Sequence, residues 1–420
     1  MIAQTATKIR GQIDRFSGNL SQGLCKVLRR LVAEVVYGIL ARRSVHLTEI
    51  GRALEEEIAL IKTENRLSRN LARPEIRSAV QAAIARQGAP RIGKDTLLVL
   101  DLSDIVKPYA KKMEHLARVR DGSKKELSDG YWLCQVIGVE CGGCEITPLY
   151  GDLYSHKAED FVSENEEVFK AMRLVSKAVD GRGIWVIDRG GDRGGIFDEL
   201  ASRGKGRRFL IRLQGDRHLL LGARKRSALW IAQGCRLPYA ATVWKEEGKG
   251  ERAYTLEYGF RRVRLPRHPD VDLWLVVVRG FGEKPLMILT NVPMRRNREV
   301  LWWAVSAYLT RWRVEETIRF SKQSYRLEDV RVRSYDRLRN LVVLATAATA
   351  FACTVLGARM KMRILASHVL AAARRVFGIP DFRYYAVADG LGEILTRFPR
   401  RRSPSARDEH ASTQLSLLPP

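Results

Sequence analysis

The chain has 420 residues, which exceeds one ordinary domain and is enough to bury a large core. Its apolar share of 45% fits a soluble globular protein. The formal net charge of +26, from 73 Lys and Arg against 47 Asp and Glu, indicates a polyanionic partner and favours nucleic acid over an anionic membrane surface.

Residues 1–92 are expected to form a helical domain. The opening "MIAQTATKIRGQIDRF" has no apolar core, so no signal peptide is expected. Apolar residues then recur at helical spacing in 23–43, 44–54 and 60–72. Two interpretations stay open: a compact DNA-binding module, helix-turn-helix-like, or a bundle whose solvated face is basic. In the third helix one face carries three basic residues at i, i+4 and i+7: Lys62, Arg66 and Arg69.

Strands and helices alternate from 93 to 204, which predicts an α/β layer domain. The strands are "TLLVLDLSDI", "YWLCQVIGVE", "ITPLYGDLY" and "GIWVID", and the helices are "FVSENEEVFKAMRLVSKAV" and "IFDELASRG". Between the second and third strands, Cys141 and Cys144 in "CGGC" resemble half a zinc site, but a glycine-centred hairpin turn is the better interpretation. The other cysteines lie mostly in apolar context, which suits a reducing cytoplasm.

Residues 205–292 read as short strands that alternate in polarity between Gly, Pro and charged residues. Nine Arg or Lys and a single acidic residue, Asp216, fall between 202 and 232, so this block begins strongly basic. The expected strands are "RFLIRLQ", "HLLLG", "ALWIA", "YAATVW", "AYTLEYGF", "RRVRL", "LWLVVV" and "PLMILTN".

Helices are expected again from about 297 to about 377, and residues 401–420 have the composition of a disordered tail. The longest uncharged run, 340–358, is rich in Ala and Thr. It favours a buried helix over a membrane span.

Two expected strands carry an aspartate in an apolar setting. Asp101 interrupts "LLVLDL" and Asp188 ends "IWVID" before the flexible "RGGDRGG". An ionised carboxylate there is costly unless it is paired or bound to a metal. Taken singly, each aspartate is better interpreted as a strand-end cap or as a partner in a salt bridge to a neighbouring Arg; a functional role is favoured only when both are considered together with a third carboxylate.

A third carboxylate lies in "YLTRWRVEETIRFSKQSYRLEDVR", residues 308–331, which lacks Gly and Pro. On a helix of about 100° per residue, four polar side chains share an arc of about 60°. Glu316 falls about 100° from Glu315 and is expected to face solvent or pair with an arginine. The alternative for Glu315 is an ordinary i, i+4 ion pair with Arg311. The four residues are Tyr308, Arg311, Glu315 and Lys322, next to an apolar stripe of Val314, Ile318 and Tyr325.

The spacing of Tyr308, Arg311, Glu315 and Lys322 resembles the Y-R-E-K signature of a large group of bacterial insertion-sequence transposases of the DDE type. "DRGGD" at 188–192 resembles the segment around that group's second aspartate, and "LVLDLS" resembles the strand that carries the first. The resemblance covers about 95–345.

The resemblance implies a fold in several parts. We expect an α/β protein whose RNase H-like mixed-sheet catalytic core is interrupted by a β-rich insertion, with an N-terminal helical domain and C-terminal helices. The core comprises 93–204 and 293–345, and the insertion comprises 205–292. The expected N-terminal helical, DNA-binding domain is 1–92, the C-terminal helical region is 346–400 and the disordered tail is 401–420.

The same resemblance implies that Asp101, Asp188 and Glu315 are catalytic and bind two Mg²⁺ ions, with Mn²⁺ as a possible substitute. Tyr308, Arg311 and Lys322 would hold DNA phosphates near the cut. The expected partners are double-stranded DNA, as terminal inverted repeats and target DNA, and a second copy in a synaptic homodimer. No membrane is expected, and the expected location is the cytoplasm, at the nucleoid.

The sequence departs from the group in two places. Members can use a tryptophan just before the last strand of the insertion to stack a flipped base, but "EKPLMILTN" has none; Trp244 and Trp274 are the nearest upstream candidates. Gly190 stands where a larger residue is common. A metal-dependent nuclease without strand transfer, and an inactive DNA-binding derivative, remain the alternatives. A membrane-surface protein would explain none of the three carboxylates.

Overall fold

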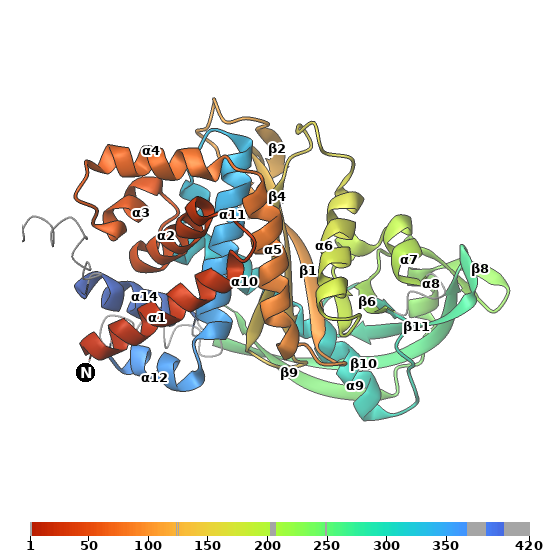
Figure 1. Ribbon diagram of the computed structural model, residues 1–420. Helices are drawn as coiled ribbons and strands as arrows, with labels where there is room; N and C mark the ends of the chain where they lie inside the picture. The colour runs from red at the N-terminus through yellow and green to blue at the C-terminus, as the bar shows by residue number, and fades with distance from the viewer. Residues whose placement is uncertain are drawn as a thin grey trace, which may run out of the picture.

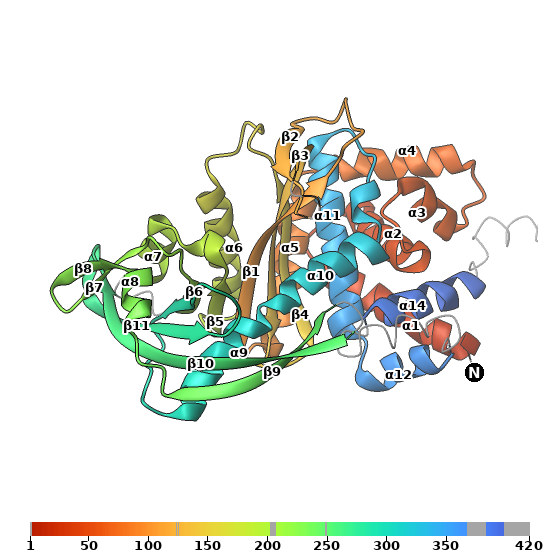
Figure 2. The same ribbon diagram turned by 180° about the vertical axis from the view of Figure 1, so that it is seen from behind.

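The computed structural model describes residues 2–122, 124, 126–201, 207–247, 250–367 and 384–398 (Figures 1 and 2). The predicted tail and the end of the predicted C-terminal helical stretch lie outside these residues. Mixed α/β architecture is confirmed: a large mixed sheet crosses the molecule, with helices on both of its faces and at both ends of the chain.

Within the described residues, twelve strands form one sheet. Its centre has the order β4-β3-β1-β5-β6, in which β3 is antiparallel to β1 and β4 while β1, β5 and β6 are parallel. This arrangement is consistent with an RNase H-like core. The strands are β1 Leu97–Val106, β2 Ala117–Arg120, β3 Leu127–Val139, β4 Ile146–Tyr154, β5 Ile184–Ile187, β6 Arg208–Arg212, β7 His218–Leu221, β8 Arg224–Ser227, β9 Tyr239–Glu247, β10 Gly250–Leu265, β11 His268–Arg279 and β12 Leu286–Thr290.

The β-rich block continues the central sheet. β12 pairs antiparallel with β6, and β11 and β10 follow outward from β12. Asn291 reinforces this seam, because its Oδ1 accepts from the Phe209 amide at 2.9 Å and its Nδ2 donates to the Arg207 carbonyl at 2.8 Å. The insertion is therefore hydrogen-bonded to the core along a strand edge.

Two predictions within this block were wrong. The stretch "ALWIA" is helix α8, Ala228–Gln233, because Ser227 caps it by accepting from the Trp230 amide and because Ala228, Ile231 and Ala232 bury one helical face. The two strands expected at 253–260 and 261–265 are one long strand, β10. Strands β2 and β8 were not predicted, since their sequences "ARVR" and "RKRS" carry little apolar signal.

Helices cover both faces because β1 is apolar on both sides. Leu97 and Val99 enter one core cluster, and Leu98 and Leu100 enter the other. The second cluster is closed by α6, Glu164–Ala178, and α7, Gly194–Ala201. The first is closed by helices of which Figure 1 shows α5 and α11 to the left of the central strands. The helices are α5 Glu75–Gly88, α9 Arg298–Thr310, α10 Trp312–Ser324 and α11 Tyr335–Ala350.

The N-terminal region is helical, as predicted, and shares the first core cluster with the C-terminal helices. Phe16 packs on Phe351 with ring centroids 5.6 Å apart, and Arg43 pairs with Asp389 at 2.5 Å. Segments from the two ends of the chain therefore lie side by side (Figure 1). The helices involved are α1 Ile2–Leu20, α2 Lys26–Arg42, α3 Leu47–Leu54, α4 Leu60–Leu71, α12 Ala358–Ser367 and α14 Tyr384–Arg397.

The long apolar run lies in α11 and the π-helical turn Phe351–Val355 that follows it. Among the described residues, Tyr335–Val355 is the one stretch long and apolar enough to cross a membrane by length and composition, with mean hydropathy 1.6. In this structure 89% of its apolar window is buried by other parts of the chain. The prediction of a buried helix is confirmed.

Asn340 on α11 offers a test of how the N-terminal helices are held. Its buried Nδ2 donates to the carbonyls of Leu71 (2.7 Å) and Arg73 (2.9 Å), at the end of α4. We expect Asn340→Leu to lower the free energy of unfolding by about 2 kcal/mol, because both carbonyls lose their donor. Urea denaturation measures this, and the exposed Asp336→Asn on the same helix should change stability by less than about 0.5 kcal/mol. Equal effects of the two substitutions would contradict the anchoring role.

Candidate active site

Asp101 and Asp188 occupy neighbouring positions on two adjacent parallel strands. The last residue pair of the β1–β5 ladder is Leu100 with Ile187, so each aspartate follows a paired residue directly. Side chains alternate along a strand, and Val99 and Val186 both enter the first core cluster. Asp101 and Asp188 therefore belong to the same face of the sheet, the face on which α10 packs (Figure 2).

The helix expected over 308–331 is interrupted. Helix α9 ends at Thr310, α10 runs from Trp312 to Ser324, and Arg311 lies between them. The turn is tight here, because Arg311 N bonds to Tyr308 O and Val314 N bonds to Arg311 O, each three residues apart. Tyr308 thus lies in the last turn of α9, while Glu315 and Lys322 lie on α10. The predicted apolar stripe of Val314, Ile318 and Tyr325 is buried, as expected.

Arg311 is the cation that links the carboxylates. Its guanidinium donates from Nη2 to Glu315 Oε1 at 2.5 Å, and its Nη1 lies 3.8 Å from Asp101 Oδ1. The side chain is only 11% exposed, and its Cζ lies 5.8 Å from the centre of the buried Tyr308 ring. Burial alone lowers the pKa of Arg311, but Tyr308, Glu315 and Asp101 together raise it. The i, i+4 ion pair between Arg311 and Glu315 that the sequence suggested is therefore present, and Arg311 also lies close to Asp101.

Asp101 carries a carboxyl group with a strongly raised pKa. Burial raises its pKa to about 7. The nearby Arg311 opposes this shift, whereas the negative charges of Asp188 and Glu315 add to it. The carboxylates of Asp188 and Glu315 therefore lie close enough to Asp101 for their charges to act on it. A buried carboxyl group beside two further acids is typical of a functional site, because burying its charged form is costly.

The two glutamates have different surroundings. Glu316 pairs with Arg313 at 2.9 Å. Pairing with an arginine was one of the two outcomes expected for Glu316 from the sequence. Lys322, one to two turns beyond Glu315, lies 3.3 Å from Asp104 Oδ2 and 3.0 Å from Glu328 Oε1. Glu315 alone is directed at Arg311 and the neighbourhood of Asp101.

The two aspartates of "DRGGD" also differ. Asp188 Oδ1 accepts from the Gly190 amide at 2.7 Å and so caps its own turn, Arg189–Gly191. Asp192 is buried, accepts from the Gln214 amide at 2.6 Å and pairs with Arg217 Nε at 2.5 Å. Asp192 therefore ties the loop to β6 and the insertion, whereas Asp188 lies at the strand end near Asp101.

The donors present suit a hard divalent cation, because all three are carboxylates. In the part of the chain that the structure describes, no group of three or more His, Cys, Asp or Glu side chains is arranged closely enough to hold a metal ion. The positive charge nearest the carboxylates is that of Arg311, which draws Glu315 to itself. The three carboxylates thus lie close enough for their charges to interact, but their side chains are not arranged as metal ligands in this structure.

A cleft of about 1370 Å³ opens beside this site. Asp101 and Glu315 line it; Asp188 does not. Nine of its lining residues are Lys or Arg and six are Asp or Glu, so the lining of the cleft carries a net positive charge. Sequence reasoning missed most of this wall, including Lys107 and Asp104; the basic run "KPYAKK" directly after β1 was the available signal.

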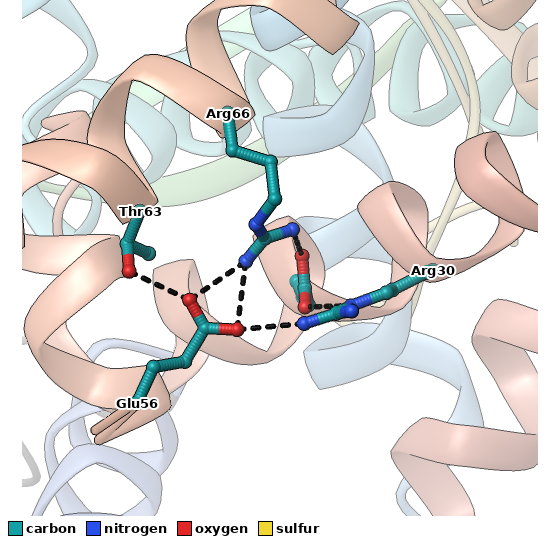
Figure 3. A network of polar contacts seen from close by, with 5 residues as sticks. Arg30, Glu56, Thr63 and Arg66 are labelled. Atoms are coloured by element: carbon teal, nitrogen blue, oxygen red, sulfur yellow. Dashed lines mark hydrogen bonds and ion pairs between the residues drawn. The ribbon is translucent and has the colours of Figure 1, made fainter. Parts of the chain in front are cut away.

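The three basic residues expected on one face of α4, Lys62, Arg66 and Arg69, differ in their burial and ion pairing. Arg66 is held between Glu34 at 2.6 Å and Glu56 at 3.0 Å, and Glu56 also pairs with Arg30 and accepts from Thr63 (Figure 3). Lys62 and Arg69 are exposed. Arg66 therefore fixes α4 against α2 and the α3–α4 loop, and its charge is compensated within the protein.

The remaining sequence features are placed as follows. "CGGC" forms the turn of the β3–β4 hairpin, with Gly142 at φ +71°, as predicted. Cys141 and Cys144 are both free thiols. Trp244 is 68% exposed on β9, and Trp274 is half-buried on β11; neither lines the cleft.

Comparison with known proteins points to one family. Residues 161–351 match the family described as Transposase DDE domain. The match includes Asp188 and Glu315 and begins after Asp101, and it supports a DNA transposase function. No curated protein matches the chain. Among solved structures, the cryo-EM structure of a piggyBac transposase synaptic complex with hairpin DNA is similar over 98% of this chain and 83% of that chain, with 12% identity and a TM-score of 0.44.

The pKa of Asp101 predicts a pH dependence of stability in the absence of divalent metal. Its ordinary value is 3.8, and its value in the fold is about 7, so the folded state binds the extra proton between these limits. Stability is fully present below the lower value and is lost as pH rises through the higher one. We expect Asp101→Asn to match the wild type near pH 4 and to have a Tm several degrees higher at pH 8, measured by calorimetry in EDTA.

The difference between the two proteins isolates Asp101, because other titrating groups are common to both. A constant difference in Tm from pH 4 to pH 8 would contradict the assignment. Loss of the 3.8 Å approach to Arg311 should be minor, since Arg311 keeps Glu315 as its partner.

Proposed function

We propose that this chain is a transposase that cleaves the DNA ends of an insertion sequence and joins the freed 3′-hydroxyl to target DNA. The observation that carries the proposal is the burial of Asp101 beside Asp188 and Glu315, on adjacent strand ends and a packed helix. The family match over residues 161–351 supports DNA transposition, and the Y-R-E-K spacing favours the insertion-sequence group that carries this signature.

In this proposal Asp101, Asp188 and Glu315 hold two divalent ions, Mg²⁺ or Mn²⁺. When bound, such ions activate water or a DNA 3′-hydroxyl as the nucleophile and stabilise the leaving oxygen at the scissile phosphate. The fit rests on the chemistry of the donors and on the position of Asp101, a carboxyl group whose pKa is raised first by burial and further by the negative charges of Asp188 and Glu315. No covalent link between enzyme and DNA is needed.

The chain's own residues perform the remaining work. Arg311 compensates Asp101 and Glu315 and so links the junction of α9 and α10 to β1. Lys322 and Arg311, each close to an acid in this structure, supply positive charge where phosphates of the DNA approach the carboxylates. Tyr308 is buried under Arg311 and acts by orienting it.

The partners follow from charge and chemistry. The net charge of +26 and the basic cleft favour double-stranded DNA, first as terminal inverted repeats and then as target. A synaptic homodimer would bring two ends together, and the exposed Lys62 and Arg69 on α4 are candidates for contact with DNA away from the cut. Such a protein would work in the cytoplasm, at the nucleoid.

The proposal predicts that Asp188→Asn and Glu315→Gln each reduce cleavage to background, because either change removes a negative ligand while keeping the size of the side chain. The assay supplies DNA that carries the element's own terminal inverted repeats together with Mg²⁺, and products are resolved on a gel. DNA binding, measured separately by mobility shift, should stay within about twofold of the wild type.

Glu316→Gln is the matched control, since Glu316 is the next residue on the same helix and pairs with Arg313 instead. It should cut at close to the wild-type rate. Cutting without joining by the wild-type protein would favour the nuclease, and a shift without any cutting would favour an inactive derivative. Wild-type cleavage rates in Asp188→Asn or Glu315→Gln would overturn the assignment of the carboxylates.

A second prediction concerns the metal itself. Mg²⁺ or Mn²⁺ at millimolar concentration should raise the Tm of the wild-type protein at pH 8 and leave that of Asp101→Asn unchanged, because ligands that bind the folded state stabilise it. Asp152→Asn is the control. Asp152, on β4, is also buried with a pKa raised to about 7, but its carboxylate lies 3.8 Å from Arg77 on α5 and 3.8 Å from Arg339 on α11. Loss of the metal response in both variants, or in neither, would contradict the proposed ligand set.

A further inference from the structure

One exposed aromatic side chain lines the cleft next to the candidate active site. Tyr109 is 94% exposed, the highest fraction for any large apolar side chain among the described residues. It lines the same cleft as Asp101 and Glu315. An aromatic ring in contact with water is unfavourable, so a ring held in this position points to a ligand with a flat apolar face.

The backbone presents Tyr109 at the apex of a tight turn. The Ala110 amide donates to the Lys107 carbonyl at 3.1 Å, which closes a four-residue turn with Pro108 in its second position and Tyr109 in its third. Proline is favoured in that second position because its φ is already fixed at the required value. The turn therefore holds the Tyr109 backbone while leaving its side chain uncovered.

The segment that carries the turn is fixed at both ends. At the first end, the buried Lys107 donates from Nζ to the carbonyls of Glu328 and, at 2.7 Å, Val330. At the other end, the Glu114 amide donates to the Arg333 carbonyl at 3.0 Å. Both contacts reach the chain that follows α10. The Tyr109 turn is thus tied to the same part of the protein as the glutamate helix, and its position relative to Glu315 is set.

The surface around Tyr109 is basic. Acidic residues of the cleft are largely engaged: Asp104 and Glu328 lie within 3.3 Å and 3.0 Å of Lys322, and Asp329 pairs with Arg326. A positive groove with an aromatic platform is the arrangement by which proteins bind unpaired nucleic-acid strands, since phosphates meet the cations and a base stacks on the ring. The exposed basic residues of the cleft are Lys111, Lys112, Arg120, Lys124, Arg319, Arg331 and Arg333.

We propose that Tyr109 is a base-stacking residue that holds an unpaired base of the DNA substrate beside Asp101 and Glu315. Bases inside an intact duplex cannot present a face to the ring, so the ligand is a nucleotide freed from its partner near the cut. This inference rests on the proposed function, because it takes the DNA in the cleft to be the substrate. The aromatic residues of the insertion are not needed for it: Trp244 and Trp274 lie outside the cleft lining.

The test compares two DNA probes in EDTA, so that no cleavage occurs. One is a duplex with three unpaired nucleotides at one end that include 2-aminopurine, and the other is the fully paired duplex. We expect the wild-type protein to prefer the unpaired end and to quench its 2-aminopurine fluorescence by stacking. Tyr109→Ala should weaken binding of the unpaired end by about tenfold and abolish the quenching. Affinity for the paired duplex should change by less than about twofold.

Two variants complete the design. Tyr109→Phe keeps the ring and should retain both the affinity and the quenching. Trp230→Ala removes another exposed aromatic residue, 54% exposed on α8 and outside the cleft lining, and should behave as the wild type. If Tyr109→Ala binds and quenches as the wild type does, or if the wild type shows no preference for the unpaired end, the base-stacking role is wrong.

These outcomes are separable from failure of the proposed function. A wild-type protein that binds neither probe at low salt removes the DNA partner and both proposals with it. A wild-type protein that cleaves its terminal repeats, while Tyr109→Ala is indistinguishable from it on the unpaired probe, removes only the assignment of Tyr109.

Discussion

The arrangement at the centre of this protein depends on three carboxylates that lie close to one another, one of them buried away from water. Asp101 is buried where β1 leaves its pairing with β5, and Asp188 and Glu315 add their charges to its own. Such a cluster persists only when cations compensate it. In the protein alone, Arg311 does so, and its contacts with Glu315 and Asp101 connect α10 to the sheet. The break between α9 and α10 falls at the residue that makes this link.

The surrounding structure holds these groups from several directions. Alternation along β1 and β5 places both aspartates on one face, and two apolar core clusters keep the strands between helices. Asp192 secures the loop after Asp188 through Arg217, and Lys107 secures the segment after α10 through backbone carbonyls. None of these contacts involves the three central carboxylates. Side chains other than the three carboxylates therefore fix these loops, even where they are neighbours of a carboxylate in sequence.

Much of this was predictable from the residues, for definable reasons. Apolar runs such as "TLLVLDL" identify buried strands without knowledge of the fold, and an aspartate within such a run is conspicuous because its burial is costly. Helical periodicity likewise separated Glu315 from Glu316. What failed depended on distant partners or on local capping. Ser227 turned an apolar stretch into α8, and Glu34 and Glu56, from outside α4, compensate Arg66. The Tyr109 turn lies in the same cleft as Glu315 because α10 packs beside β1, and the sequence does not show that packing.

The seam between β6 and β12 has a mechanical consequence. Because strand hydrogen bonds and Asn291 join the insertion to the core edge to edge, the two cannot rotate independently without breaking the ladder. The β-rich block is then a rigid extension of the central sheet and not a hinged lid. Any accommodation between this protein and a bulky ligand must come from bending of the ligand or from the loops at the rim.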